Sequence, residues 1–493
     1  GLSTLTCRVC SPWALSRHWS STAVRLAQSE RGRMHWLSTL LLVLVDWPPP
    51  SPCGAEHETV VCQRDVVYKR DGLGNCTALM TASEVTWRER QLNTSLIGRV
   101  ALELESNARL ECLHLGGYKW FGVGTAGARA LAEALKKNDA LRVLSLPKSK
   151  IDDEGLWALA DALEVNQALT TLRLSSYRPY GDEGARALAR IISKNKGLRT
   201  LDVSATGIEA AGVRAIAEAL KTNKVLTTLD LSRNQIGVDG MRALSEALKV
   251  NTALSSLRLS SNMIGGAEGA KNLSDALMLN TVLTSLTLEC DPSYCYTGSG
   301  NGLEEQGVRA LSAALKANVA LSTLDLSNNG AIGDEGAKAL AEALKANKVL
   351  ANLQLGNTGV HKQGAAALAA SLKLNQRLTT LGLSRNCMGD EGAIALGEAL
   401  RVNRVLAKLG LSSSCVQGAG ALALREVLQT NPALVALEFE GNWIRLEDSQ
   451  PLVEAASSPQ SGASKALAID HFGSPPPPPP PPRHRNKRKR STH

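Results

Sequence analysis

Aromatic residues are scarce in this 493-residue chain, at 3% of positions. Leucine, alanine and glycine dominate instead, a composition that suits short helices and tight turns. No apolar run approaches the roughly 20 residues that a helix needs to cross a bilayer. The chain is longer than an ordinary single domain, and a repeat architecture escapes that limit because each unit buries its core against its neighbours.

Signatures of common catalytic sites are also missing. The sequence holds no G-x-x-x-x-G-K-[ST], no H-E-x-x-H and no G-x-S-x-G, and its histidines are scattered. The glycine-rich residues 298–302 lack the flanking strand and helix of a dinucleotide-binding loop, so we interpret them as an ordinary loop. The sequence predicts no enzyme, no cofactor, no metal site and no small-molecule substrate.

Positive charge is concentrated at one end of the chain. The net charge is +9, yet the body of the chain is nearly balanced, which gives no strong signal for a nucleic-acid groove. The excess follows a polyproline run and comes from Arg483, Arg485, Lys487, Arg488, Lys489 and Arg490.

Asparagine recurs about every 28 residues over most of the chain. From Asn138 onward each asparagine has leucine three and six positions later and glycine eleven positions earlier, a register that chance does not produce. The asparagines are Asn107, Asn138, Asn166, Asn195, Asn223, Asn251, Asn280, Asn318, Asn347, Asn375, Asn403 and Asn431.

Each repeat contains the pattern of one strand and one helix. Residues 226–231, LTTLDL, alternate with period two and predict a strand. Residues 240–250 carry leucines four apart and predict a short helix, in which Gly240 allows close approach to the neighbouring repeat. Asn251 is expected to end this helix in a left-handed conformation, with its side chain bonded to local backbone.

About twelve such units give an α/β solenoid, a horseshoe with parallel strands on its concave face and helices on its convex face. The pattern fits the leucine-rich repeat template L-x-x-L-x-L-x-x-N/C-x-L. More narrowly, it resembles the ribonuclease-inhibitor-like subtype, as in ribonuclease inhibitor, NOD-like receptor repeat regions and the Ran GTPase-activating protein. The template has an asparagine of its own, distinct from the asparagine that follows each helix, and serine or threonine replaces it in several repeats. The second ladder, formed along the turns by these template asparagines, is therefore expected to be incomplete.

The solenoid divides the chain into four parts. Residues 1–55 are a targeting segment or an incorrectly assigned start, and residues 56–106 are an N-terminal cap region. Residues 107–445 form the solenoid, and residues 446–493 hold a cap remnant and the proline-rich basic tail. The first segment and the tail are expected to be disordered.

One candidate binding surface is a column of strand residues on the concave face. It contains Arg173, Asp202, Asp230, Arg258 and Asp325. Neighbouring strands lie about 4.8 Å apart, so Arg173 can pair with Asp202, and Asp230 with Arg258. The column is then a self-satisfied ionic ladder, which we favour over a binding site.

The second candidate surface is the rim formed by the loops that follow the strands. Aromatic residues gather there, and tyrosine and tryptophan are common binding hot spots. Insertions into repeats also map to one face, often the binding face. The predicted partner-binding rim consists of Tyr118, Trp120, Phe121, Tyr177, Tyr180, Tyr294 and Tyr296.

The compartment depends on where translation starts. The apolar stretch after Met34 resembles a secretory signal peptide, whereas residues 1–33 are closer to a transit peptide. The chain is secreted or endomembrane if Met34 starts a signal peptide, and otherwise cytoplasmic or nuclear. The cysteines and sequons that bear on this are Cys290, Cys295, Cys387 and Cys415 as possible disulfides, and Asn75, Asn93 and Asn272 as possible glycosylation sites.

The sequence thus predicts a non-enzymatic leucine-rich-repeat scaffold that binds a protein partner. One alternative is a GTPase-activating protein of the Ran-activator type, although that family has an acidic tail where this chain has a basic one. Another is a cytoskeletal or signalling adaptor whose polyproline tail binds a proline-recognition domain.

Overall fold

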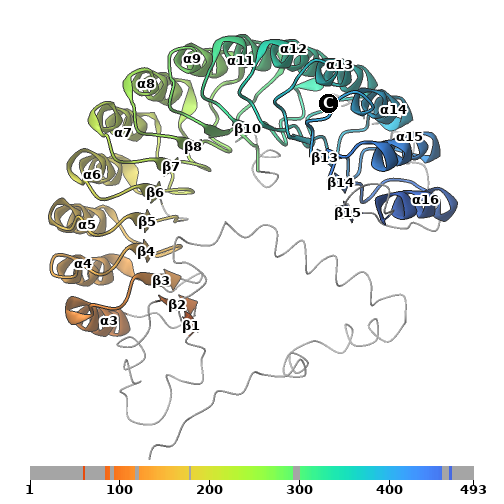
Figure 1. Cartoon of the computed structure of the whole chain (residues 1–493). Coiled ribbons are helices and arrows are strands. Elements are labelled where there is room, and N and C mark those ends of the chain that lie inside the picture. The colour runs from red at the N-terminus through yellow and green to blue at the C-terminus, as the bar shows by residue number, and fades with distance from the viewer. Residues whose placement is uncertain are drawn as a thin grey trace, which may run out of the picture. The chain divides into compact units, whose positions relative to one another are not determined.

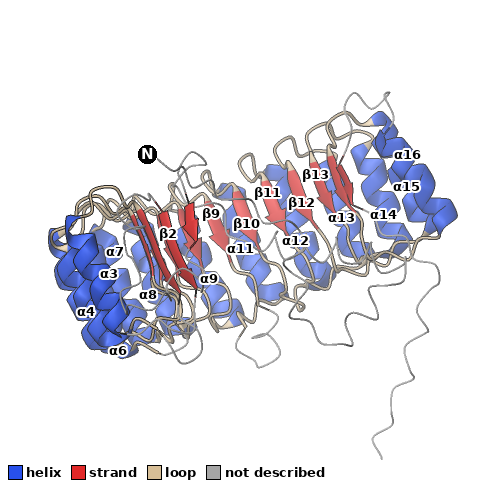
Figure 2. Ribbon diagram, turned by 90° about the horizontal axis from the view of Figure 1, so that it is seen from below, coloured by secondary structure: helices blue, strands red, loops and turns tan. Residues whose placement is uncertain are grey.

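The computed structural model describes residues 59–61, 84–88, 94–116, 122–176, 179–291, 300–457 and 466–468. All of them belong to one compact unit, Glu58–His493. Strands and helices alternate along this unit, and the strands pair in sequence order within one parallel sheet. The strands line the inner side of an open arc and the helices its outer side (Figures 1 and 2), which confirms the predicted α/β solenoid.

The sheet has 15 strands within the described residues. They are β1 (Thr59–Val61), β2 (Glu84–Arg88), β3 (Cys112–Gly116), β4 (Val143–Ser145), β5 (Thr171–Arg173), β6 (Thr200–Asp202), β7 (Thr228–Asp230), β8 (Ser256–Arg258), β9 (Ser285–Thr287), β10 (Thr323–Asp325), β11 (Asn352–Gln354), β12 (Thr380–Gly382), β13 (Lys408–Gly410), β14 (Ala436–Glu438) and β15 (Ala466–Ala468).

The helices of the outer layer are α3 (Thr94–Ser106), α4 (Gly124–Leu135), α5 (Asp153–Val165), α6 (Gly181–Lys194), α7 (Ala210–Thr222), α8 (Gly237–Val250), α9 (Gly266–Leu277), α11 (Glu305–Ala317), α12 (Gly333–Ala346), α13 (Lys362–Leu372), α14 (Gly389–Leu400), α15 (Gly418–Thr430) and α16 (Leu446–Ser457). Strand–helix units follow one another from β3 and α4 to β14 and α16. The expected cap regions contribute to the same sheet, through β1 and β2 before these units and β15 after them.

The core lies between the sheet and the helices. Leu229 from β7 and Leu244 from α8 are both fully buried, as the two periodicities predict. A Cβ atom on Gly240 would lie 2.8 Å from Ile236 Cγ2 and 3.3 Å from Ala210 Cα of helix α7. Gly240 therefore stands where its helix approaches the preceding repeat too closely for a side chain.

The recurring asparagine follows the helix, but the expected left-handed conformation is wrong. Asn251 has φ −72° and ψ 131°, which is extended backbone. Its Oδ1 accepts hydrogen bonds from the backbone N–H groups of Ala253 at 2.9 Å and Leu254 at 2.7 Å, so the predicted local bonding is present. Its Nδ2 also donates to the carbonyls of Leu220 at 2.6 Å and Asn223 at 3.1 Å in the preceding repeat.

The left-handed positions lie elsewhere in the repeat. Arg233 has φ 58° in the loop after β7, and Gly237 has φ 62° where helix α8 begins. The equivalent loop residue three repeats later, Asn328, has φ 62°. The chain thus turns sharply before each helix, while the asparagine after the helix continues in an extended direction toward the next strand.

The second asparagine ladder is more complete than expected. Asn234 Nδ2 donates to the carbonyl of Val203 at 3.0 Å, and Thr206 Oγ1 substitutes by donating to the same carbonyl at 2.7 Å. Asn301, in the segment interpreted as an ordinary loop, fills the ladder position of its repeat: its Oδ1 accepts from the N–H of Asn262 at 2.7 Å. Ser149 Oγ, in contrast, is buried without a hydrogen-bond partner among the described residues.

Candidate functional site

Charged side chains gather on the concave side between β6 and β10. Asp202, Asp230, Arg258 and Asp325 are the last residues of their strands, and the sheet register places the first three side by side. The following loops add further charges at the same edge of the parallel sheet. We define the concave cluster as Asp202, Asp230, Arg233, Arg258, Glu289, Asp291 and Asp325.

The ionic ladder expected along this column is interrupted. Arg258 Nε lies 3.3 Å from Asp230 Oδ2, so the second predicted pair is present. The first pair is absent: Arg173 stands beside Asp202 in the register, yet no ion pair joins these two described residues. Asp202 Oδ1 accepts from the N–H of Ser204 at 2.9 Å, so the carboxylate caps its own turn.

Asp230 and Asp325 cap their turns in the same way. Asp230 Oδ1 accepts from the N–H of Ser232 at 2.8 Å, and Asp325 Oδ1 accepts from the N–H of Ser327 at 2.9 Å. The backbone therefore fixes the orientation of each carboxylate through Oδ1 and leaves the second oxygen for another group, which at Asp230 is Arg258. The aspartates are positioned by the fold and do not require a cation to hold them.

The repeat between Asn280 and Asn318 is ten residues longer than the usual 28, and the first residues of this long insertion, Cys290 and Asp291, lie at the concave cluster. The carboxylate of Asp291 pairs with Arg233, and the Asp291 N–H donates to Ser261 Oγ at 2.7 Å. Beside it, Glu289 Oε1 accepts from Asn328 Nδ2 at 3.0 Å. The insertion that was predicted to extend the rim therefore begins at the concave cluster.

The cluster carries an excess of negative charge, with five carboxylates against the two guanidinium groups of Arg233 and Arg258. Burial raises the pKa of Asp230, and the neighbouring Asp202 raises it further. Burial likewise raises the pKa of Glu289, with additional contributions from Asp325 and Asp291. Crowded carboxylates of this kind attract cationic groups. No group of metal-ligating residues is found in the described ranges.

Tyr180 does not belong to an exposed rim, contrary to the prediction. Its side chain is only 1% exposed and packs in the hydrophobic core, and its hydroxyl donates to the carbonyl of Leu174. Tyr180 stands four residues before the glycine Gly184, and the corresponding position in the next repeats holds Ile208 and Ile236, which are also buried. This column spacing was the sequence signal that identifies Tyr180 as a core residue.

The other predicted rim residues lie outside the described part of the chain. They are Tyr118, Trp120, Phe121, Tyr177, Tyr294 and Tyr296. Residues 1–55 and the proline-rich basic tail also lie outside it. No helix in the described ranges is long and apolar enough to span a membrane.

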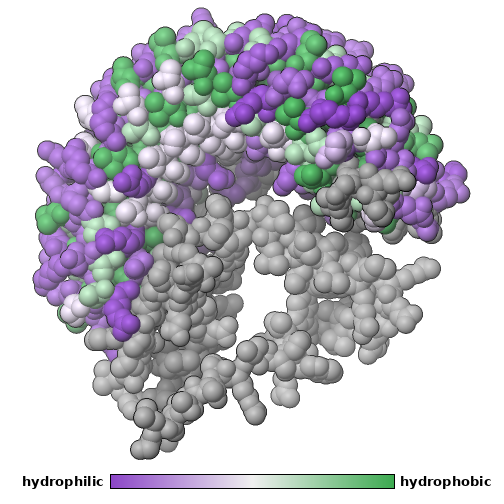
Figure 3. Space-filling view, in the orientation of Figure 1, coloured by the Kyte–Doolittle hydropathy of each residue, from purple (hydrophilic) through white to green (hydrophobic). Residues whose placement is uncertain are grey.

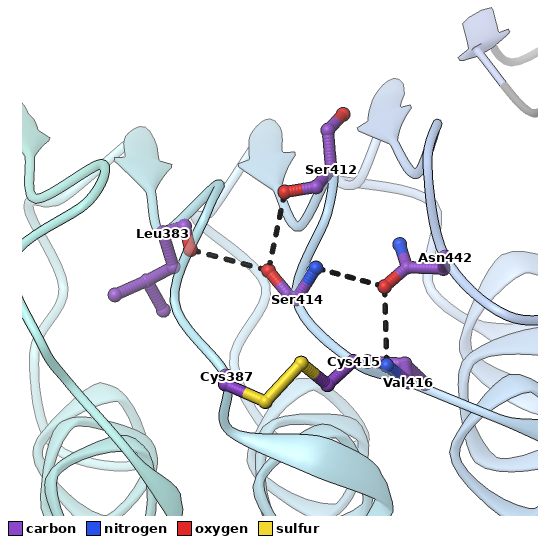
Figure 4. Close-up of a disulfide and its surroundings, with 7 residues drawn as sticks. All are labelled: Leu383, Cys387, Ser412, Ser414, Cys415, Val416 and Asn442. Atoms are coloured by element: carbon purple, nitrogen blue, oxygen red, sulfur yellow. Dashed lines mark hydrogen bonds between the residues drawn. A yellow bond between two sulfur atoms is a disulfide. The ribbon is translucent and has the colours of Figure 1, made fainter. Parts of the chain in front are cut away.

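A disulfide joins Cys387 to Cys415 in the adjacent repeat, with their Cα atoms 5.0 Å apart (Figure 4). Beside it, Ser414 Oγ fills the second ladder by donating to the carbonyl of Leu383 at 3.3 Å. Cys290 is also disulfide-bonded, as is Cys112, and Cys295 lies outside the described residues.

The sequons have different outcomes. Asn75 and Asn93 lie outside the described residues. Asn272 lies within helix α9, and its Nδ2 atom is buried without a hydrogen-bond partner there. A glycan is attached through this nitrogen, so its burial disfavours glycosylation of Asn272 in the folded chain.

The convex side offers a weaker site. A shallow groove between α7 and α8 is lined by charged residues that pair with one another, such as Lys221 with Glu218 at 2.6 Å and Arg242 with Asp239 at 2.9 Å. Exposed aliphatic residues such as Val250 stand at single positions near helix ends. Hydrophobic residues accordingly form separate patches among hydrophilic ones on the face shown in Figure 3.

The fold and its repeating ladders define a parallel α/β repeat solenoid, a class with an extended concave binding surface. The family described as Leucine Rich repeat matches residues 194–217, 222–245, 317–341 and 374–397. The chain therefore contains leucine-rich repeats, and such repeats support a protein-interaction scaffold. No curated protein sequence matches it.

Three solved structures are similar to parts of this chain. Leiomodin-1 actin-binding site 2 is 26% identical, with a TM-score of 0.24, over 27% of this chain and 74% of that chain. The tropomodulin C-terminal domain of Caenorhabditis elegans is 17% identical, with a TM-score of 0.27, over 30% of this chain and 90% of that chain. The yeast complex of Rad7 and Elc1 is 16% identical, with a TM-score of 0.39, over 72% of this chain and 86% of that chain. These low TM-scores carry no functional conclusion.

Proposed function

We propose that the protein is a non-enzymatic scaffold that binds a protein partner through the concave cluster. The observation that carries this proposal is the incomplete self-pairing of the cluster. Asp202, Glu289 and Asp325 form no ion pair among the described residues; Asp202 lies beside Asp230 in the sheet, and the charge of Glu289 interacts with that of Asp325. A partner that presents lysine or arginine would complete the pairing.

The energetic cost of the cluster supports a binding role. The raised pKa values of Asp230 and Glu289 mean that the folded state disfavours their ionised forms. Residues whose ionisation lowers the stability of their own fold are expected at functional sites. The paired charges on the helices carry no such cost, so they are better explained as a solvated surface.

We also propose that the repeats are of the ribonuclease-inhibitor-like subtype. The support is the long repeat, about 28 residues, in which each strand is followed by an α-helix of up to 14 residues. This subtype assignment concerns architecture, and it does not require the activity of any named relative.

The predicted rim completes the proposed site. Tyr294 and Tyr296 belong to the insertion whose first residues, Cys290 and Asp291, adjoin the concave cluster. Tyrosine supplies contact area with little loss of conformational entropy, whereas carboxylates supply charge selectivity and orientation. We therefore propose that the insertion and the cluster contact the same partner.

The test is to capture partners with the full chain and with two charge variants, and to identify them by mass spectrometry. The site variant combines Asp202→Asn with Asp325→Asn, because asparagine retains the Oδ1 acceptor that caps each turn. The control combines Glu218→Gln with Glu246→Gln, which removes two exposed carboxylates on α7 and α8. We expect the control and the unmodified chain to capture the same partner and the site variant to lose it. Equal capture by all three chains would refute the concave site.

A further inference from the structure

We propose that the concave cluster binds the chain's own basic segment, residues 483–490, so that the tail competes with the partner. This inference rests on the proposed function because it assigns a regulator to the same face. The proposed occupant is a segment of this chain, and no other described segment covers the strand ends of the cluster. Charge, reach and the direction of the sheet support it.

Charge complementarity is the first argument. The segment RHRNKRKR contains six lysine and arginine residues and no acid. The cluster presents five carboxylates and only two guanidinium groups, and Asp202, Glu289 and Asp325 form no ion pair in the described ranges, although Arg258 lies near Glu289. Arginine and lysine donors can therefore supply the charge that the cluster lacks.

The rest of the described surface competes poorly for the same segment. Acidic residues on the helices are largely neutralised by their own neighbours, for example Glu246 by Lys249 at 2.6 Å and Glu335 by Lys338 at 2.6 Å. Those pairs are exposed and contribute little, yet they leave little unbalanced negative charge. The cluster is distinguished by carboxylates that the backbone holds in place without a cation.

The direction of the sheet brings the tail to the correct edge. β15 is parallel to the other strands, so its carboxyl end at Ala468 lies at the same sheet edge as the carboxyl ends of β6 to β10. The cluster residues occupy or follow those ends. The chain that leaves β15 therefore starts on the edge where its proposed site lies and does not have to cross the helical layer.

The intervening chain is long enough. Along the sheet, β10 lies five strands before β15 and β6 lies nine before it, which corresponds to roughly 24 Å and 43 Å at about 4.8 Å per strand. Between Ala468 and Arg483 stand six residues and then eight prolines. A polyproline helix rises about 3.1 Å per residue and extended chain up to about 3.3 Å, giving a reach of about 45 Å.

Binding of a separate peptide tests the inference on the full-length chain. The probe is a fluorescent peptide of residues 483–490, and its affinity is measured by anisotropy. In a neutral-tail variant, Gln replaces Arg483, Arg485, Lys487, Arg488, Lys489 and Arg490. We expect this variant to bind the peptide at least about tenfold more tightly than the unmodified chain, because its own tail no longer competes at high effective concentration.

Two further variants locate the peptide site on the neutral-tail background. Asp202→Asn, Glu289→Gln and Asp325→Asn together should weaken binding at least about tenfold, since they remove three unpaired charges. The convex pair Glu218→Gln and Glu246→Gln should leave binding unchanged. Equal peptide affinity of the neutral-tail and unmodified chains, or no loss with the cluster variant, would overturn the inference. Tail-dependent dimers in light scattering would overturn it in favour of a second copy.

The outcomes also separate this inference from the proposed function. If partner capture needs Asp202 and Asp325 but the peptide does not compete with the tail, the regulation is refuted and the binding face stands. If the peptide binds the cluster while partner capture ignores it, the tail occupies the face and the proposed partner site is refuted.

Discussion

The side-chain amide of Asn403 donates a hydrogen bond to the main-chain carbonyl of Asn375, 28 residues earlier, at 3.0 Å. Asn403 also donates to the carbonyl of Leu372 at 2.8 Å, and its Oδ1 accepts from the N–H groups of Val405 at 3.0 Å and Leu406 at 2.8 Å. One buried side chain thus satisfies backbone groups in two repeats, which explains why the same residue recurs in each.

Asn403→Ala should destabilise the protein by at least about 1–3 kcal/mol, because it leaves buried backbone donors and acceptors without partners. Urea denaturation measures the loss, and hydrogen exchange at Val405 and Leu406 shows whether it is local. Arg404→Ala, at the exposed neighbouring position, is the control. Equal stability of the two variants would show that the ladder contributes nothing.

Gly240→Val should destabilise by roughly 1–3 kcal/mol, because a side chain there overlaps Ile236 and crowds Ala210 of the preceding repeat. Gly98→Ala is the matched control in another helix, where a Cβ atom meets nothing within 4 Å. The control should be neutral or slightly stabilising, since alanine favours helix. Thermal melting of both variants checks the prediction, and an unchanged midpoint for Gly240→Val would contradict it.

The fold was predictable because its determinants repeat. Buried leucines equivalent to Leu229 occur at the same position in each repeat, so the same local pattern predicts the same structure many times over. The conformation of Asn251 was not predictable from its type, because the bonds that select extended backbone come from Leu220 and Asn223 of another repeat. Tyr180 was misassigned because its aromatic character was given more weight than its position in the repeat, which buried isoleucines occupy in the next two repeats.

The site was less predictable than the fold. Strand register follows from the period, so the pairing of Asp230 with Arg258 was correct. The register also places Arg173 beside Asp202, yet no ion pair joins these two described residues, and periodicity does not reveal that difference. The contact of Asp291 with Arg233 joins residues 58 apart in sequence, and it depends on the path of the insertion.

Replacing both Cys387 and Cys415 by serine should lower stability by about 2–4 kcal/mol, because the bond closes a loop of 28 residues between adjacent repeats. Denaturation with and without reductant provides the measurement: reductant should destabilise the unmodified chain more than the double variant. An equal loss of stability in both chains would show that the Cys387–Cys415 bond does not account for the effect of the reductant. Mass spectrometry of a non-reduced digest identifies the pairing.

Glu289→Gln should stabilise the protein at pH 7. The folded pKa of Glu289 lies above its unfolded value, so the stability of the unmodified chain is greatest below the unfolded pKa and falls as pH rises through the folded pKa. Glutamine keeps the Oε1 acceptor for Asn328 and removes the charge. We expect a gain of less than about 1 kcal/mol that disappears under acidic conditions. Melting temperatures across pH 3 to 7 decide this, and a loss of stability at pH 7 would contradict the electrostatic account.

The most direct test of the concave site is the affinity of the purified partner, measured by isothermal titration calorimetry. The chains compared are the unmodified protein, Asp202→Asn with Asp325→Asn, Tyr294→Ala with Tyr296→Ala, and the convex control Glu218→Gln with Glu246→Gln. We predict losses of about tenfold or more for both site variants and none for the control. Unchanged affinity of the aspartate variant would contradict the account, and a loss confined to the tyrosine variant would place the partner on the insertion alone.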